Sequence, residues 1–123
     1  MDDFWYRIPP WATTLVLHNW PVMLWPALAI WAAVRAYLRP GRPILLFLYG
    51  SVILTVAFEY QKHGLGPVES TIYYVFARGP NVRDVLATVM VDWLPVAMNV
   101  FGFALLALSV VTSRRRFTSL GRN

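Results

Sequence analysis

The chain has 123 residues, of which 58% are hydrophobic and 14% are charged, and its formal net charge is +5. Soluble domains carry about 25% charged residues, so this composition is typical of a membrane protein. The absence of cysteine excludes disulfides, thiolate metal sites and cysteine nucleophiles. The positive charges flank apolar stretches and form no separate basic domain, so we expect no binding to nucleic acid.

Three apolar stretches are each long enough for a helix that crosses a hydrocarbon core, which takes about 20 residues. The sequence therefore predicts an all-α integral membrane protein, with residues 1–123 forming a single three-span membrane domain. The predicted spans cover residues 20–38, 43–60 and 85–112.

The ends of the first and third helices carry recognisable signals. Asn19 is predicted as the N-cap of the first helix, with Pro21 in its first turn. Asn81 is predicted to cap an early start of the third helix. Pro95 removes one backbone hydrogen bond, so a kink is expected near Val91.

The segment between the second and third spans, residues 67–79, is too short to cross a membrane. Val68, Ile72, Val75 and Phe76 recur at helical spacing, which favours a short helix lying in the outer interface. An irregular loop is the alternative.

Lysine and arginine are distributed unequally between the two sides of the predicted spans, and this bias sets the orientation. One side has Arg35, Arg39, Arg42, Arg114, Arg115, Arg116 and Arg122, and the other has Arg7, Lys62, Arg78 and Arg83. We therefore expect an external N-terminus and a cytoplasmic C-terminus in a bacterial inner membrane.

Three ionisable residues fall at one depth, near the outer boundary of the predicted spans: His18, Glu59 and Asp92. Ionisable groups at membrane depth are costly, which makes them candidates for a function. One interpretation is a hydrogen-bonded cluster that fixes helix register. The other is a site for a proton, an ion, a quinone or a metal.

His18 is the candidate cofactor ligand, because neutral imidazole binds haem iron and chlorophyll-type magnesium. A haem with two histidine ligands would also need His63. Two histidines in the chain are a weak signal, so we expect no metal and no cofactor. A haem, a chlorophyll-type pigment or a bound lipid is the alternative.

Small and polar residues form stripes that predict helix packing, since such faces let membrane helices approach closely. Ser51 and Thr55 lie on the second span, and Asn99, Gly102 and Ser109 lie on the third. The opposite faces carry large apolar residues, which meet either lipid or other subunits.

No catalytic motif, phosphate-binding loop or central charged residue occurs in the spans, so we expect neither an enzyme in this chain alone nor a transporter. The interpretation we favour is a small accessory subunit that packs against, stabilises or helps assemble a larger membrane complex, without a soluble substrate. Analogy of architecture indicates electron transport or photosynthesis. The alternatives are a self-associating, membrane-permeabilising protein, similar in topology to some phage holins, and a membrane anchor subunit that binds haem or pigment.

Overall fold

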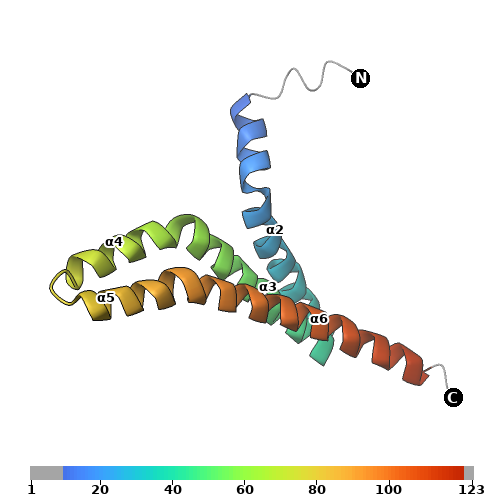
Figure 1. The fold of residues 1–123 in the computed structure, drawn as a ribbon. Coiled ribbons are helices and arrows are strands. Elements are labelled where there is room, and N and C mark those ends of the chain that lie inside the picture. Colours follow the sequence, from blue (N-terminus) through green and yellow to red (C-terminus); the bar gives the residue numbers. More distant parts are fainter. Residues whose placement is uncertain (1–9, 121–123) are drawn as a thin grey trace.

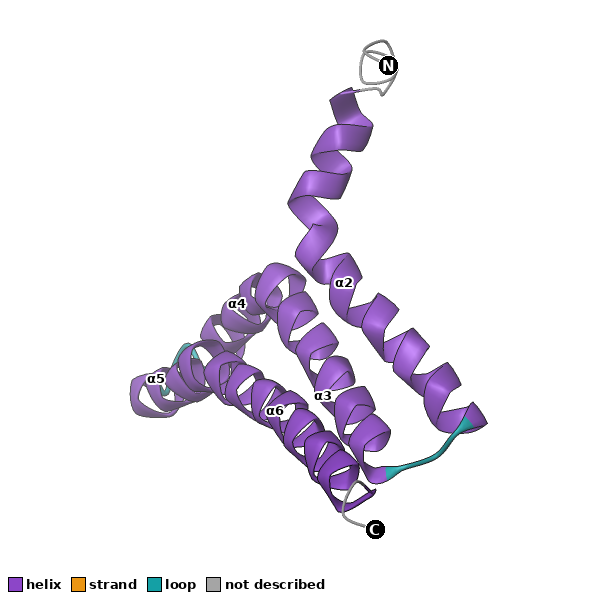
Figure 2. Ribbon diagram, turned by 90° about the vertical axis from the view of Figure 1, so that its right-hand side faces the viewer, coloured by secondary structure: helices purple, strands orange, loops and turns teal. Residues whose placement is uncertain are grey.

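The protein is a bundle of long helices in three rods (Figures 1 and 2). The computed structural model describes residues 10–120, apart from the side chains at positions 13, 15–18, 21 and 116–120. Within this part no strand occurs, so the predicted all-α class is confirmed. The elements are α2 (Pro10–Leu38), α3 (Arg42–Glu59), the π-helical turn η1 (Tyr60–Gly64), α4 (Leu65–Val75), α5 (Pro80–Ala87), the π-helical turn η2 (Thr88–Trp93) and α6 (Leu94–Leu120).

Two of the rods form a helical hairpin. One runs without a break over Arg42–Val75 and the other over Pro80–Arg115, and a short connection joins them at the hairpin tip (Figure 1). Both rods are long and apolar enough to cross a membrane by length and composition, and Val22–Leu38 is a shorter apolar helix.

Helix α2 is the third rod, and α3 lies between α2 and α6 (Figure 2). The first part of α2 extends beyond α3 and points away from the hairpin (Figures 1 and 2). At the opposite end a short loop joins α2 to α3, and we call this end the basic end. It carries Arg35, Arg39 and Arg42, together with Arg114 and Arg115 near the end of α6.

The prediction that Asn19 caps the first helix is wrong. Helix α2 covers Pro10–Leu38 in the described part of the chain, so Asn19 lies inside it. Asparagine is accommodated within the helix because its amide oxygen accepts a hydrogen bond from the Lys62 ammonium. The Thr14 hydroxyl also donates to the Pro10 carbonyl (3.0 Å).

The rod Pro80–Arg115 begins before its predicted cap. Gly79 is the N-cap and Pro80 is the first helical residue, so Asn81 lies inside α5. Proline is well suited to the first helical position because its fixed φ is helical and its missing N–H has no partner there. The irregularity expected near Val91 takes the form of the π-helical turn η2.

Helices α3 and α6 approach closely at two glycines. A Cβ atom on Gly50 would lie 2.9 Å from the Gly102 carbonyl oxygen, and one on Gly102 would lie 2.7 Å from Cγ of Leu54. Nearer the basic end, the buried Ser109 hydroxyl donates to the Pro43 carbonyl (2.7 Å). Small residues at a helix contact allow such backbone proximity, so this seam holds the hairpin together.

At the hairpin tip, α4 and α5 are joined by a cation–π contact. The guanidinium carbon of Arg83 lies 5.1 Å from the centre of the Tyr73 ring. The Arg83 Nε is also 3.0 Å from the Asp84 carboxylate. A cation over an aromatic face contributes roughly 0.5–1 kcal/mol at an exposed site, so the tip is held mainly by local contacts.

Ser51 lies in the α3 interior with no exposed surface, and its hydroxyl has no hydrogen-bond partner among the described atoms. An unpaired buried hydroxyl costs free energy. We therefore expect Ser51→Ala to leave the unfolding free energy unchanged or to raise it by up to about 1 kcal/mol. Thermal unfolding in detergent would measure this, and a clear loss of stability would reveal a partner for the hydroxyl.

Candidate functional site

The two π-helical turns face each other across the hairpin and form what we call the elbow, Tyr60–Gly64 of η1 and Thr88–Trp93 of η2. Each turn interrupts an otherwise continuous α-helix. Such single-turn interruptions occur frequently at functional sites. The elbow is therefore the candidate site of this fold.

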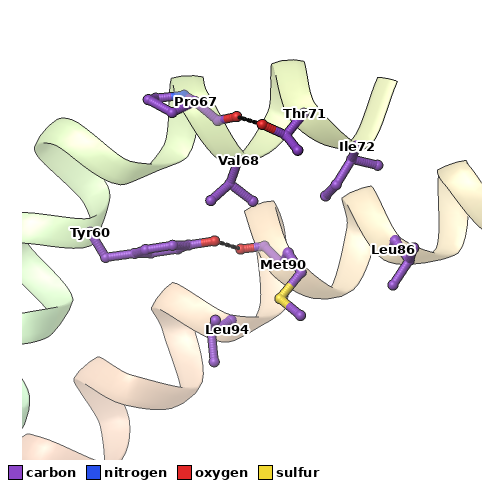
Figure 3. Close-up of a pocket in the computed structure, with 8 residues that line it drawn as sticks. All are labelled: Tyr60, Pro67, Val68, Thr71, Ile72, Leu86, Met90 and Leu94. Carbon is purple, nitrogen blue, oxygen red and sulfur yellow. Dashed lines mark hydrogen bonds between the residues drawn. The ribbon is translucent and has the colours of Figure 1, made fainter. Parts of the chain in front are cut away.

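A hydrogen bond across the elbow compensates for the irregular backbone of η2. In a regular α-helix the Met90 carbonyl would accept from the Leu94 N–H, but that N–H bonds to the Val89 carbonyl instead. The next residue, Pro95, has no N–H to offer. The Tyr60 hydroxyl donates to the Met90 carbonyl at 2.7 Å (Figure 3), so one rod supplies the donor that the other lacks.

A glycine accommodates this tyrosine. A Cβ atom on Gly64 would lie 2.8 Å from Cδ2 of Tyr60, so the ring occupies the space that any other residue at position 64 would need. The sequence of η1, YQKHG, thus places a tyrosine and a glycine so that the ring can reach η2.

The elbow borders a pocket of about 420 Å³ between α4 and the α5–η2–α6 rod (Figure 3). The two hydroxyls in its wall are already engaged, because Thr71 donates to the Pro67 carbonyl (2.7 Å) and Tyr60 to Met90. The pocket therefore suits an apolar group and offers no free acid or base. Its lining consists of Tyr60, Pro67, Val68, Thr71, Ile72, Leu86, Met90 and Leu94.

Polar side chains lie on the α2 side of η1. The Lys62 ammonium donates to the Asn19 amide oxygen, which ties η1 to the middle of α2. Glu59 and His63 are one turn apart, 3.9 Å between carboxylate and imidazole, with side chains 47% and 66% exposed. An exposed pair of this kind contributes little to stability, so the Lys62–Asn19 contact is the structural link here.

Of the three ionisable residues predicted to form a cluster, the structure describes the side chains of Glu59 and Asp92. His18 belongs to α2, but its side chain lies outside the described residues. Glu59 pairs with His63, and no described hydrogen bond or ion pair joins it to the exposed Asp92. Among the described side chains no group of three histidine, aspartate or glutamate residues could hold a metal ion.

The residues predicted to pack the helices behave differently from one another. Gly102 and Ser109 lie buried in the seam, and Ser109 bonds across it. Thr55 and Asn99 instead bond within their own helices, to the carbonyls four residues earlier (2.8 and 2.9 Å). Ser51 is buried and unpaired.

Sequence reasoning missed the roles of Tyr60, Lys62 and Met90. Lys62 was expected only as one of the charges that set the orientation. A signal was present in Pro95, which must leave a carbonyl in the preceding turn without its donor. Tyr60 in the facing rod was a candidate to supply this donor, because Gly64, four residues later, leaves room for its ring.

Comparison of the chain with protein-family models, with curated proteins and with solved structures finds no match. No activity, ligand or partner therefore comes from a relative, and the function is argued from the residues described above.

Tyr60→Phe removes the hydroxyl that reaches Met90. We expect the unfolding free energy to fall by about 0.5–1.5 kcal/mol, the usual net contribution of one hydrogen bond. Amide hydrogen exchange should accelerate in residues 88–94. The matched control is Tyr49→Phe, at an exposed tyrosine of α3. Unchanged exchange in Tyr60→Phe would show that the hydrogen bond does not hold η2 in place.

Lys62→Met removes the polar contact between η1 and Asn19. We expect the first part of α2 to separate from the hairpin, so that the distance between positions 14 and 74 becomes longer and more broadly distributed. Because the chain has no cysteine, spin labels on cysteines introduced at the exposed Thr14 and Tyr74 would report this by electron-spin distance measurement. Gln61→Met, at the exposed neighbouring position, is the control and should match the unmodified protein.

Proposed function

We propose that the protein is an integral membrane subunit that packs against a larger membrane complex and stabilises it or helps it assemble. The observation that carries this proposal is the apolar exterior. Among the described side chains 28 large hydrophobic residues are exposed, whereas four hydrophobic residues are buried: Ala32, Leu54, Ala57 and Ile72. Soluble monomers rarely expose contiguous apolar patches of such extent.

The charge distribution supports a defined orientation. The arginines of the basic end favour the cytoplasmic side, and the described carboxylates all lie toward the elbow and the tip: Glu59, Glu69, Asp84 and Asp92. In this proposal the C-terminus is cytoplasmic and the elbow lies at the outer surface of a bacterial inner membrane. Helix α4 and the start of α5 then project beyond the hydrocarbon core.

Several features favour a packing role over catalysis. The elbow pocket is apolar, and its two hydroxyls are occupied by backbone carbonyls. Helix α2 packs mainly on α3, and Trp20 of α2 and Trp93 of η2 are exposed at 56% and 68%. Large aromatic residues are enriched at subunit contacts and at membrane interfaces. Electron transport or photosynthesis is the proposed setting, by analogy of architecture.

Purification of the tagged full chain from its native membrane in mild detergent tests this role. We expect fixed partner subunits to copurify and expression of the chain alone to be harmless. Homo-oligomers together with growth arrest on expression alone would overturn the proposal in favour of the holin-like alternative. A visible absorption band that is lost in His18→Ala would favour the haem- or pigment-binding anchor.

Membrane integration and orientation are tested separately. The protein should resist extraction by alkaline carbonate, and reporter fusions should place the N-terminus outside and the C-terminus in the cytoplasm. Extraction by carbonate would refute integration. Reporters showing a cytoplasmic N-terminus would refute the orientation.

A further inference from the structure

A second groove lies at the basic end, where α2, α3 and α6 come together. Its volume is about 850 Å³, within the range of 300–1,000 Å³ typical of ligand sites. Its lining combines large apolar side chains with arginines and serines: Leu28, Trp31, Arg35, Arg39, Pro43, Ile44, Phe47, Ser109, Val110, Ser113 and Arg114.

Aromatic contacts shape the apolar part of this groove. Trp31 of α2 meets Phe47 of α3 edge to face, with ring centres 5.7 Å apart. Farther from the basic end, Trp25 of α2 meets Phe103 of α6 in the same manner at 5.6 Å. This second contact bridges α2 and α6 beyond the groove, so the lining residues lie between that bridge and the basic end.

The mouth of the groove is cationic. Arg35, Arg39 and Arg114 line it, and no carboxylate is among the lining residues. The described carboxylates belong to α3, α4, α5 and η2 at the other end of the molecule. Leu28 and Arg35 are seven residues apart on one helix, about 10 Å at 1.5 Å per residue. An apolar slot thus leads into a cluster of positive charge within the depth of one lipid leaflet.

We propose that this groove binds one anionic phospholipid of the cytoplasmic leaflet, with its phosphate among the three arginines and an acyl chain along Trp31, Phe47 and Val110. This inference rests on the proposed function as a membrane subunit. Charge complementarity and the adjoining apolar wall together select this occupant. Free phosphate would leave the apolar wall uncovered, and an apolar helix of a second copy would offer no negative charge to Arg35 and Arg39.

Arginine variants test the headgroup contact. The purified full chain, in mild detergent, is titrated with phosphatidylglycerol or phosphatidylcholine, and bound lipid is counted by native mass spectrometry. We expect one tight phosphatidylglycerol and a weaker phosphatidylcholine. Arg35→Gln and Arg39→Gln should each reduce the phosphatidylglycerol affinity about fivefold, since a basic residue near an anionic surface contributes about 1 kcal/mol. Arg115→Gln removes the same charge outside the lining and should have little effect.

A filling variant tests the acyl-chain contact. Val110→Trp places a large ring in the groove and should abolish the tight lipid, whereas Val111→Trp, at the next position outside the lining, should retain it. If Val110→Trp fails to fold, the arginine variants decide. Equal binding of the two lipids, an affinity loss equal in Arg35→Gln and Arg115→Gln, or displacement of the lipid by inorganic phosphate alone would overturn the proposal. So would a dimer in which photocrosslinks from position 110 reach a second copy.

The outcomes separate this inference from the proposed function. If the protein resists carbonate extraction and copurifies with partners but shows no preference for phosphatidylglycerol, the lipid site is rejected and the proposed subunit role stands. If carbonate extracts the protein, both the lipid site and the proposed subunit role are rejected.

Discussion

Gly102→Leu is expected to force α3 and α6 apart and to lower the unfolding free energy by about 3 kcal/mol, the upper end of the usual cost of overpacking. A Cβ at this position would already lie 2.7 and 2.9 Å from Cγ and Cδ2 of Leu54, and leucine adds three further carbons. Leu54 has no exposed surface, so it has little space into which to move. The helices must therefore separate.

The measurement is the thermal unfolding midpoint in mild detergent. Gly66→Leu is the matched control, because no atom beyond its chain neighbours and its own helix backbone lies within 4 Å of the Cβ position at Gly66. That substitution should change the unfolding free energy by less than about 1 kcal/mol, since replacing a glycine favours the helix whereas a side chain before Pro67 disfavours it. A Gly102→Leu protein as stable as Gly66→Leu would show that α3 and α6 do not meet at this seam.

Leu54→Ala is expected to lower the unfolding free energy by about 2–4 kcal/mol, because truncation of a buried leucine removes its packing and leaves a cavity. Leu54 is the largest fully buried side chain of the described residues. Val56→Ala, two positions along the same helix at 51% exposure, is the control and should cost less than 1 kcal/mol.

The same pair of residues allows a sharper test through coupling. Gly102→Ala alone should destabilise the protein because its Cβ meets Leu54. In the Leu54→Ala background the added methyl group enters the vacated space, so the two effects should fall short of additivity by about 0.5–3 kcal/mol. Strict additivity would mean that the two positions are not in contact.

The helical architecture could be predicted from the sequence because it depends on local patterns. The second span was expected over residues 43–60, and α3 covers Arg42–Glu59. This helix follows the turn RPGRP, in which Pro43 stands near the helix start and Gly41 is the N-cap. Two successive apolar rods separated by a Gly-Pro pair, Gly79 and Pro80, similarly indicate a hairpin.

The extent of α2 could not be predicted in the same way, because Asn19 followed by Pro21 resembles the start of a helix. The helix instead already covers Pro10–Asn19 in the described part of the chain. Its N-terminal turns then extend past α3, and the Asn19 amide is available to Lys62.

The elbow is a tertiary feature, which is why the sequence predicted only an irregularity near Val91. Pro95 indicated a disturbed turn near Val91, but not that the disturbance would be π-helical or would be matched in η1. The hydrogen bond from Tyr60 to Met90 joins residues 30 positions apart. Its existence depends on the register between two rods, which the Gly50–Gly102 contact sets.

The paired π-helical turns have a further consequence for how the chain tolerates changes in length. A π-helical turn amounts to one extra residue in an α-helix, and each residue advances an α-helix by about 100°. Deleting one residue from η2 alone would rotate α5 relative to α6 and separate Arg83 from Tyr73. The length of each turn therefore sets which face of α4 meets α5, and a one-residue deletion in either turn should break this contact.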